Sequence, residues 1–136
     1  EGTESAHVYS SGMGAISSVM LQLCDTDDHI VSSRTIYGGT YAFLKNFVKK
    51  FNIGTSFVDI TKLDVVENAI TPKTKMIYCE AVSNPLLEIA DIKALSEIAK
   101  IFRSFAPTSS SSIMFFEKLT SVIKSVSIDS EATIFP

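Results

Sequence analysis

The sequence predicts an α/β fold in which a partial parallel sheet carries helices on both of its faces. Short apolar, β-branched segments alternate with amphipathic segments of helical period. Turns rich in glycine, serine and proline separate these segments. The apolar fraction of 46% and the mean hydropathy of +0.25 are high enough for a packed core. This alternation is typical of parallel strands joined by right-handed helical crossovers.

The first half of the chain is expected to contain two strand–helix units. The segment AHVYS, residues 6–10, is a short strand candidate, and residues 12–23 follow with apolar side chains at helical spacing. The segment HIVSS, residues 29–33, is apolar and β-branched, so we expect a second strand there. The turn IYGGT leads to a helix over residues 41–51, which has a phenylalanine-rich stripe and is ended by NIG.

The second half repeats the pattern twice. The segment TSFVD, residues 55–59, predicts a third strand, and a helix over 63–70 has Asp64 in its first turn. The segment TKMIYCE, residues 74–80, predicts a fourth strand. After the turn VSNP, Asp91 is expected to cap a helix that runs to about Phe102.

The pattern stops after this helix. Residues 1–102 are therefore expected to form a partial domain of four βα units, and residues 103–136 a divergent tail. The tail begins with a run of four serines and then an apolar patch, IMFF. We expect it to be weakly ordered or to form one helix over residues 115–126, from the spacing of Phe116, Leu119 and Ile123.

Charge and cysteine content exclude several classes of protein. The net charge is −3 and there is no basic block, so we expect no nucleic-acid partner. There is neither a long apolar run nor a secretory leader, so we expect no membrane association and a cytoplasmic location. Cys24 and Cys79 are expected to be buried small hydrophobes, and His7 and His29 are isolated, so no metal site is expected. The chain starts without Met, which suggests that an upstream segment is missing.

Candidate ligand-binding residues follow the predicted strands. Ligands of parallel α/β sheets bind beyond the carboxyl ends of the strands. Ser11 and Gly12 stand there at the start of a helix, where backbone N–H groups either bind a phosphate or form a plain corner. Tyr37, before Gly-Gly, either stacks on a flat heterocycle or covers the sheet edge. Glu80 and Asn84 flank a turn, where the asparagine either orients a ring oxygen or forms an Asx turn.

Together these strand ends resemble the Cys/Met-metabolism, or transsulfuration, family of pyridoxal-phosphate enzymes. The segments SSGMGAISSVM, SSRTIYGGTYAF, SFVDIT and YCEAVSNPLLEIADI occur there in the same order and with similar spacing. The resemblance covers residues 1–101 and is greatest to methionine gamma-lyases, followed by cystathionine gamma-lyases and gamma-synthases. It implies part of the large domain of a fold-type-I pyridoxal-phosphate enzyme, a homo-oligomer acting on an amino acid.

The resemblance also implies which residues bind the cofactor, pyridoxal 5'-phosphate. The matching positions are Ser11, Gly12, Met13, Tyr37, Glu80 and Asn84. The first three would give backbone donors to the phosphate, and the tyrosine would stack on the pyridine ring. The asparagine would lie near the ring's phenolic oxygen, and the glutamate close to the same pocket.

Two catalytic motifs of the family do not follow the helix that ends near Lys100. These are a Ser-x-x-Lys segment with the Schiff-base lysine and a Val-Val-Asp-Asn-Thr strand with the ring-nitrogen aspartate. Lys118 and Lys124 lie in a different context, so neither is assigned to the lysine role. We therefore expect a truncated or mis-spliced fragment of a carbon–sulfur lyase, whose family match ends near Ile101 and which lacks catalysis. The alternative is a non-catalytic fragment that associates with full-length subunits.

Overall fold

The computed structural model describes residues 8–83, 85–105, 114–119, 122–127 and 134–135. They form one six-stranded sheet in the order β2-β1-β3-β4-β5-β6. The strands are β1 His29–Ser33, β2 Gly54–Val58, β3 Thr74–Glu80, β4 Met114–Leu119, β5 Val122–Ser127 and β6 Ile134–Phe135. Strands β1 to β4 run parallel to one another, whereas β5 pairs antiparallel with β4 and β6 pairs antiparallel with β5. The predicted α/β class with a parallel sheet is confirmed.

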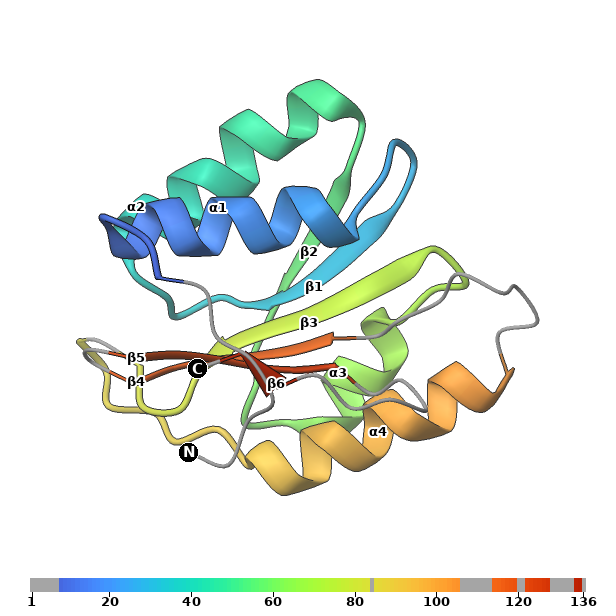
Figure 1. The fold of residues 1–136 in the computed structure, drawn as a ribbon. Coiled ribbons are helices and arrows are strands. Elements are labelled where there is room, and N and C mark those ends of the chain that lie inside the picture. Colours follow the sequence, from blue (N-terminus) through green and yellow to red (C-terminus); the bar gives the residue numbers. More distant parts are fainter. Residues whose placement is uncertain (1–7, 84, 106–113, 120–121, 128–133, 136) are drawn as a thin grey trace.

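Helices cover both faces of the sheet, as predicted (Figure 1). On one side lie α1 Gly12–Leu23 and a helical run made of α2 Gly38–Ala42, the π-helix η1 Phe43–Phe47 and the 3-10 helix η2 Val48–Phe51. On the other side lie α3 Leu63–Ala69 and α4 Ile92–Phe105. None of the helices in the described residues combines the length and apolar character needed to cross a bilayer.

The alternation of side chains along the strands divides the core in two. Along β3, Met76 and Tyr78 pack on the α1 side, whereas Ile77 and Cys79 pack on the α4 side. All four side chains have no exposed surface. Because β3 is buried on both faces, it reads as a nearly continuous apolar run, and its predicted bounds match the structure.

The helices begin and end where local chemistry sets their limits. Ser11 caps α1, and its Oγ accepts a hydrogen bond from the Gly14 N–H at 3.0 Å. Asp91 does the same for α4, with the Ala94 N–H 2.9 Å from its Oδ1. Asn52 ends the second helical run in the left-handed conformation, at φ 60°. The run begins at Gly38, three residues earlier than predicted, because the glycines of the IYGGT turn are already helical.

Two predicted elements are wrong in the described residues. Val8–Ser10 form no strand, and Val8 is 96% exposed. A strand requires hydrogen bonds to a neighbour, and no strand of the described sheet pairs with this segment. The predicted helix over 115–126 is instead the strand pair β4 and β5. Pairing of β4 with the edge of β3 satisfies backbone groups there, and the β-branched residues of β5 suit a strand.

Both cysteines are buried and free, which confirms the prediction that they act as small hydrophobes. Burial, more than the nearby Asp28 charge, raises the pKa of the Cys24 thiol to about 12. Cys24 packs in the core on the α1 side and Cys79 in the core on the α4 side. The Cys24 thiol is therefore protonated at neutral pH and is not a reactive nucleophile.

His29 joins three strands at the edge of the sheet opposite the carboxyl ends. Its Nδ1 lies 2.8 Å from Thr74 Oγ1, at the start of β3, and its Nε2 lies 2.9 Å from Ser56 Oγ in β2. Burial lowers the pKa of this ring below its ordinary value, because the charged form loses hydration. The described residues contain no cluster of histidine, cysteine and acidic side chains that could hold a metal ion.

We expect the His29 ring to make stability pH-dependent. Since its pKa is lower in the folded than in the unfolded chain, its stabilising contribution is complete above about pH 6.5 and is lost as the pH falls through the folded pKa. Urea unfolding between pH 7.5 and 5 measures this loss. His29→Gln, which cannot titrate, should show a smaller fall in unfolding free energy, and an equal fall in both proteins would contradict the expectation.

Candidate functional site

The carboxyl ends of β1, β2 and β3 meet at one edge of the sheet, and α1 begins at the same edge (Figure 1). The parallel register places the residues that follow these strands side by side. Sequence analysis predicts the ligand-binding residues at this edge, and the structure brings most of them together there.

The first turn of α1 has the features of an anion site. Ser11 and Gly12 are exposed, and a Cβ placed on Gly12 would meet no atom within 4 Å, so the backbone is open to a ligand. The first N–H groups of a helix have no intrahelical acceptor, and they carry the positive end of the helix dipole. The first turn contains no acidic side chain that would neutralise it. The donor set therefore fits a phosphate.

Tyr37 lies next to this helix end, at the entrance to α2. Its backbone N–H donates to Glu80 Oε1 at 3.0 Å, and the side chain is 52% exposed. A Cβ placed on Gly39 would lie 2.6 Å from Tyr37 Cε1 and 3.3 Å from Met13 Sδ. The tyrosine ring and Met13, in the first turn of α1, therefore border the same space. A half-exposed aromatic ring beside the open first turn of a helix suits the binding of a flat heterocycle that carries a phosphate.

Glu80, the last residue of β3, accepts the hydrogen bond from the Tyr37 N–H. It follows Met76 and Tyr78 on the α1 side of the sheet, and it is 6% exposed. Its carboxylate is thus a buried acceptor for the Tyr37 N–H rather than a solvent-exposed ligand. Burial raises the pKa of the Tyr78 phenol, which lies beside the Thr40 hydroxyl.

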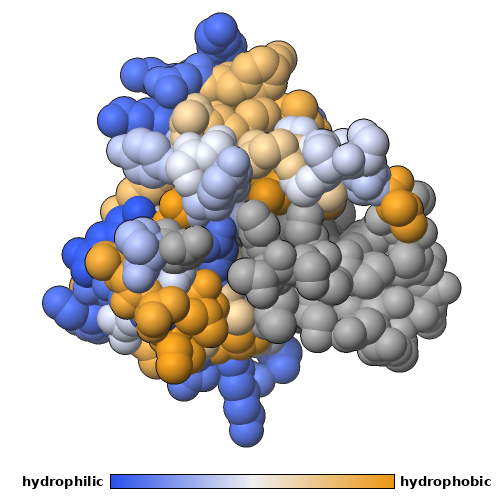
Figure 2. Space-filling model, turned by 90° about the vertical axis from the view of Figure 1, so that its left-hand side faces the viewer, coloured by the Kyte–Doolittle hydropathy of each residue, from blue (hydrophilic) through white to orange (hydrophobic). Residues whose placement is uncertain are grey.

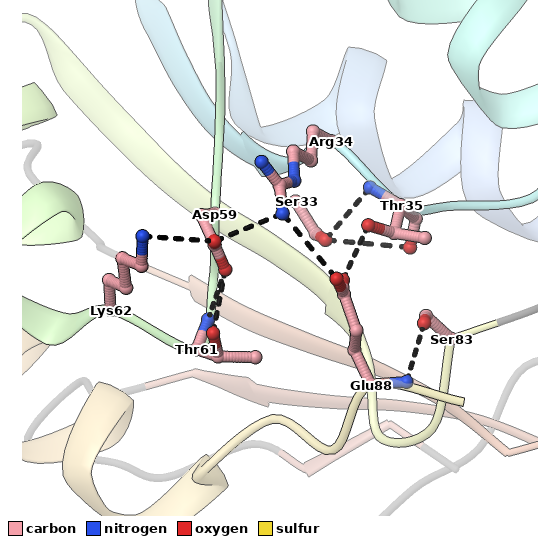
Figure 3. A network of polar contacts seen from close by, with 8 residues as sticks. All are labelled: Ser33, Arg34, Thr35, Asp59, Thr61, Lys62, Ser83 and Glu88. Atoms are coloured by element: carbon pink, nitrogen blue, oxygen red, sulfur yellow. Dashed lines mark hydrogen bonds and ion pairs between the residues drawn. The ribbon is translucent and has the colours of Figure 1, made fainter. Parts of the chain in front are cut away.

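A polar network links the residues that follow β1 and β2 with the loop that follows β3 (Figure 3). The guanidinium of Arg34, after β1, lies 3.0 Å from Asp59 Oδ2 and 3.5 Å from Glu88 Oε1. The Thr35 hydroxyl donates to Glu88 Oε2 at 2.6 Å. Hydrogen bonds from Thr61, and then the Arg34 charge, lower the pKa of Asp59. Arg34 is half exposed, so we assign the network to loop geometry rather than to stability.

The loop after β3 is compact and apolar on its outside. Its main chain closes through the Ser83 N–H to Glu88 O at 2.9 Å, and Leu87 has a φ of 54°. Figure 2 shows hydrophobic side chains gathered on the face where the strands end. The exposed hydrophobic residues of this loop are Val82, Leu86, Leu87 and Ile89. Asn84, predicted to bind the cofactor, lies outside the described residues.

The predicted site residues are thus brought together except for Asn84. Ser11, Gly12 and Met13 form the helix end, and Tyr37 and Glu80 are joined by a hydrogen bond. The predicted site residues do not include three that shape the site, namely Gly39, Thr40 and Glu88. Gly39 could have been found from the sequence, because it is the second glycine of the IYGGT turn and only glycine leaves room there for the tyrosine ring. Glu88 had no signal, because its partners are distant in sequence.

A parallel sheet with an open helix start and an adjacent aromatic ring at its carboxyl edge is the arrangement expected of a domain that binds a phosphate-bearing cofactor. The model of the Cys/Met metabolism PLP-dependent enzyme family matches residues 1–106. Methionine gamma-lyase of Arabidopsis thaliana is 54% identical over 101 residues, which are 73% of this chain and 23% of that protein. Cystathionine gamma-lyase of Bacillus subtilis is 42% identical over 100 residues, 74% of this chain and 26% of that protein.

A solved structure supports the same assignment. It is a putative O-acetylhomoserine (thiol)-lyase from Campylobacter jejuni, with N'-pyridoxyl-lysine-5'-monophosphate, and it is 30% identical to this chain. The TM-score is 0.68 over 80% of this chain and 30% of that one. The chain therefore belongs to the Cys/Met-metabolism family of pyridoxal-phosphate-dependent enzymes, as its sequence predicts. It spans about a quarter of the length of the curated relatives given above.

Proposed function

We propose that this chain binds pyridoxal 5'-phosphate at the carboxyl edge of its sheet, as part of a carbon–sulfur lyase of methionine and cysteine metabolism. The observation that carries the proposal is the Tyr37 ring beside the first turn of α1. The amides of Ser11, Gly12 and Met13 bind the phosphate, and the Tyr37 ring stacks on the pyridine. In the full-length protein the cofactor supplies an electron sink for cleavage of a carbon–sulfur bond in a sulfur-containing amino acid. We propose a cytoplasmic location for this protein.

The two remaining predicted residues, Asn84 and Glu80, have different roles. The family motif implies a role for Asn84 as a hydrogen-bonding partner of the phenolic oxygen of the ring. Glu80 is buried and accepts the Tyr37 N–H, which keeps the backbone of the stacking residue in place. The support for the role of Asn84 is the matching order and spacing of the family segments, and the support for the role of Glu80 is its hydrogen bond with the Tyr37 N–H.

A charge change at Ser11 tests the phosphate seat. Asn and Asp cap a helix about as well as Ser, so Ser11→Asn and Ser11→Asp should both keep α1. Only Asp adds a negative charge, and two like charges about 4 Å apart in water repel by about 1 kcal/mol. Ser11→Asp should therefore weaken binding of pyridoxamine 5'-phosphate about fivefold relative to Ser11→Asn. Fluorescence titration measures the two affinities, and equal values would contradict a phosphate at this helix end.

We expect this chain to hold the cofactor without a covalent bond, because no lysine stands in the family's Ser-x-x-Lys context. The backbone register pairs Glu80 of β3 with Lys118 of β4, so one lysine position does adjoin the site. After borohydride treatment of the chain with one equivalent of pyridoxal 5'-phosphate, peptide mapping should find no single lysine modified stoichiometrically. Stoichiometric modification of Lys118 or Lys124 would contradict this expectation.

A second candidate function rests on the exposed apolar residues of the loop after β3 (Figure 2). Four large hydrophobic side chains on one loop favour association with another protein. In this alternative the chain is a non-catalytic piece that pairs with full-length homo-oligomeric subunits. Co-purification with a full-length relative would support it, and a monomer by light scattering in a mixture of the two would contradict it.

A further inference from the structure

The Tyr37 ring lies close to the backbone of one of the two glycines that follow it. Gly38 and Gly39 both lie in the first turn of α2, and neither has a positive φ. A Cβ on Gly38 would meet no atom within 4 Å. A Cβ on Gly39 would lie 2.6 Å from Cε1 and 3.2 Å from Cδ1 of Tyr37. Only the second glycine therefore makes room for the ring.

The backbone of the same residue has a separate support. The Tyr37 N–H donates to Glu80 Oε1 at 3.0 Å, and Glu80 is 6% exposed. A buried acceptor that is removed leaves its donor unpaired, which favours movement of the loop. The bond joins the end of β3 to the start of α2, and the two bonded residues are 43 positions apart in the sequence.

We propose that Gly39 and Glu80 are positioning residues, which hold the Tyr37 ring against Met13 at the start of α1 so that it stacks on the pyridine of the bound cofactor. Gly39 leaves the space that the ring occupies close to α2, because it has no side chain. Glu80 holds the Tyr37 backbone by accepting its N–H. The proposal rests on the proposed function for the ligand, whereas the ring position itself is a property of the chain alone.

The two glycines provide a matched pair of variants. The atoms that a Gly39 Cβ would meet belong to side chains, and the Tyr37 ring is half exposed, so it can swing outward without loss of the helix. In uniformly labelled protein without ligand, nuclear Overhauser effects between the Tyr37 ring and the Met13 methyl group should be present in the wild type and in Gly38→Ala. They should be absent in Gly39→Ala.

The affinity for ligands should follow the ring position. Gly39→Ala should bind pyridoxamine 5'-phosphate about threefold to tenfold more weakly than Gly38→Ala, as expected for a lost aromatic stacking contact. Inorganic phosphate, which lacks a ring, should bind both variants equally. Equal binding of pyridoxamine 5'-phosphate by the two variants, or an unchanged Overhauser effect in Gly39→Ala, would overturn the role of Gly39.

A second pair separates positioning by Glu80 from direct contact with the cofactor. Glu80→Gln keeps an oxygen acceptor for the Tyr37 N–H, so it should retain the wild-type Overhauser effect and affinity. Glu80→Ala should lose both. A loss in Glu80→Gln equal to that in Glu80→Ala would overturn positioning through this hydrogen bond. Absence of pyridoxamine 5'-phosphate binding in the wild type would instead overturn the proposed function, while the Overhauser effects still decide whether the two residues hold the ring.

Discussion

Replacing Ile77 by alanine is expected to lower the free energy of unfolding by about 2–5 kcal/mol, the largest stability effect among the changes considered. Ile77 has no exposed surface and lies in β3, which has β1 on one side and β4 on the other. Its side chain packs in the core with Leu95 and Ile98 of α4. The substitution removes buried methyl groups and leaves a cavity that rigid neighbours on strand and helix fill only in part.

The matched control is Ile89→Ala. The chemical change is identical, but the Ile89 side chain is 72% exposed in the loop after β3. Its replacement should change the unfolding free energy by less than about 0.5 kcal/mol. Urea unfolding followed by circular dichroism gives both values, provided that the two variants have equal slopes with denaturant. Similar losses in the two variants would contradict burial of Ile77 in the core between the sheet and α4.

Replacing Tyr37 by alanine is expected to weaken binding of pyridoxamine 5'-phosphate about tenfold or more. Stacking of a flat heterocycle on an aromatic side chain contributes about 1–3 kcal/mol when measured by alanine substitution. Tyr37 is half exposed, so its removal opens no core cavity and should leave the fold intact. Fluorescence titration of the wild type and the variant measures the ratio of the two dissociation constants.

Two comparisons make this prediction specific to the ring. Tyr37→Phe keeps an aromatic face and should bind within about threefold of the wild type. Inorganic phosphate should compete with equal strength in all three proteins, because it requires only the start of α1. If Tyr37→Ala weakened inorganic phosphate as much as pyridoxamine 5'-phosphate, the residue would act on the helix end rather than through stacking.

Most of the fold follows from local patterns in the sequence. The bounds of α1 and β3 were predicted correctly, because a capping serine, helical spacing and a continuous buried run are local signals. The errors concern segments whose structure depends on distant partners. Residues 115–126 have apolar positions compatible with a helix, and only the free edge of β3 selects the strand pair β4 and β5. Val8–Ser10 have strand-like residues but no partner strand in the described sheet.

The site was predictable as a set of residues but not as an arrangement. The rule that ligands bind at the carboxyl ends of parallel strands placed Ser11, Tyr37 and Glu80 at one edge. It did not show that Glu80 accepts the Tyr37 N–H, since the two elements meet only in the folded sheet. The reason for the second glycine of IYGGT likewise required the direction of the tyrosine ring. The role of Asn84 stays a prediction.

The central claim is that the start of α1 and the Tyr37 ring form one seat for a phosphate-bearing pyridine. Titration of 15N-labelled chain with pyridoxamine 5'-phosphate, followed by amide chemical shifts, tests it most directly. We predict saturable shifts at one ligand per chain, largest at the amides of Gly12, Met13 and Tyr37 and displaced by excess inorganic phosphate. Shifts that do not saturate, or that cluster away from these amides, would contradict the claim.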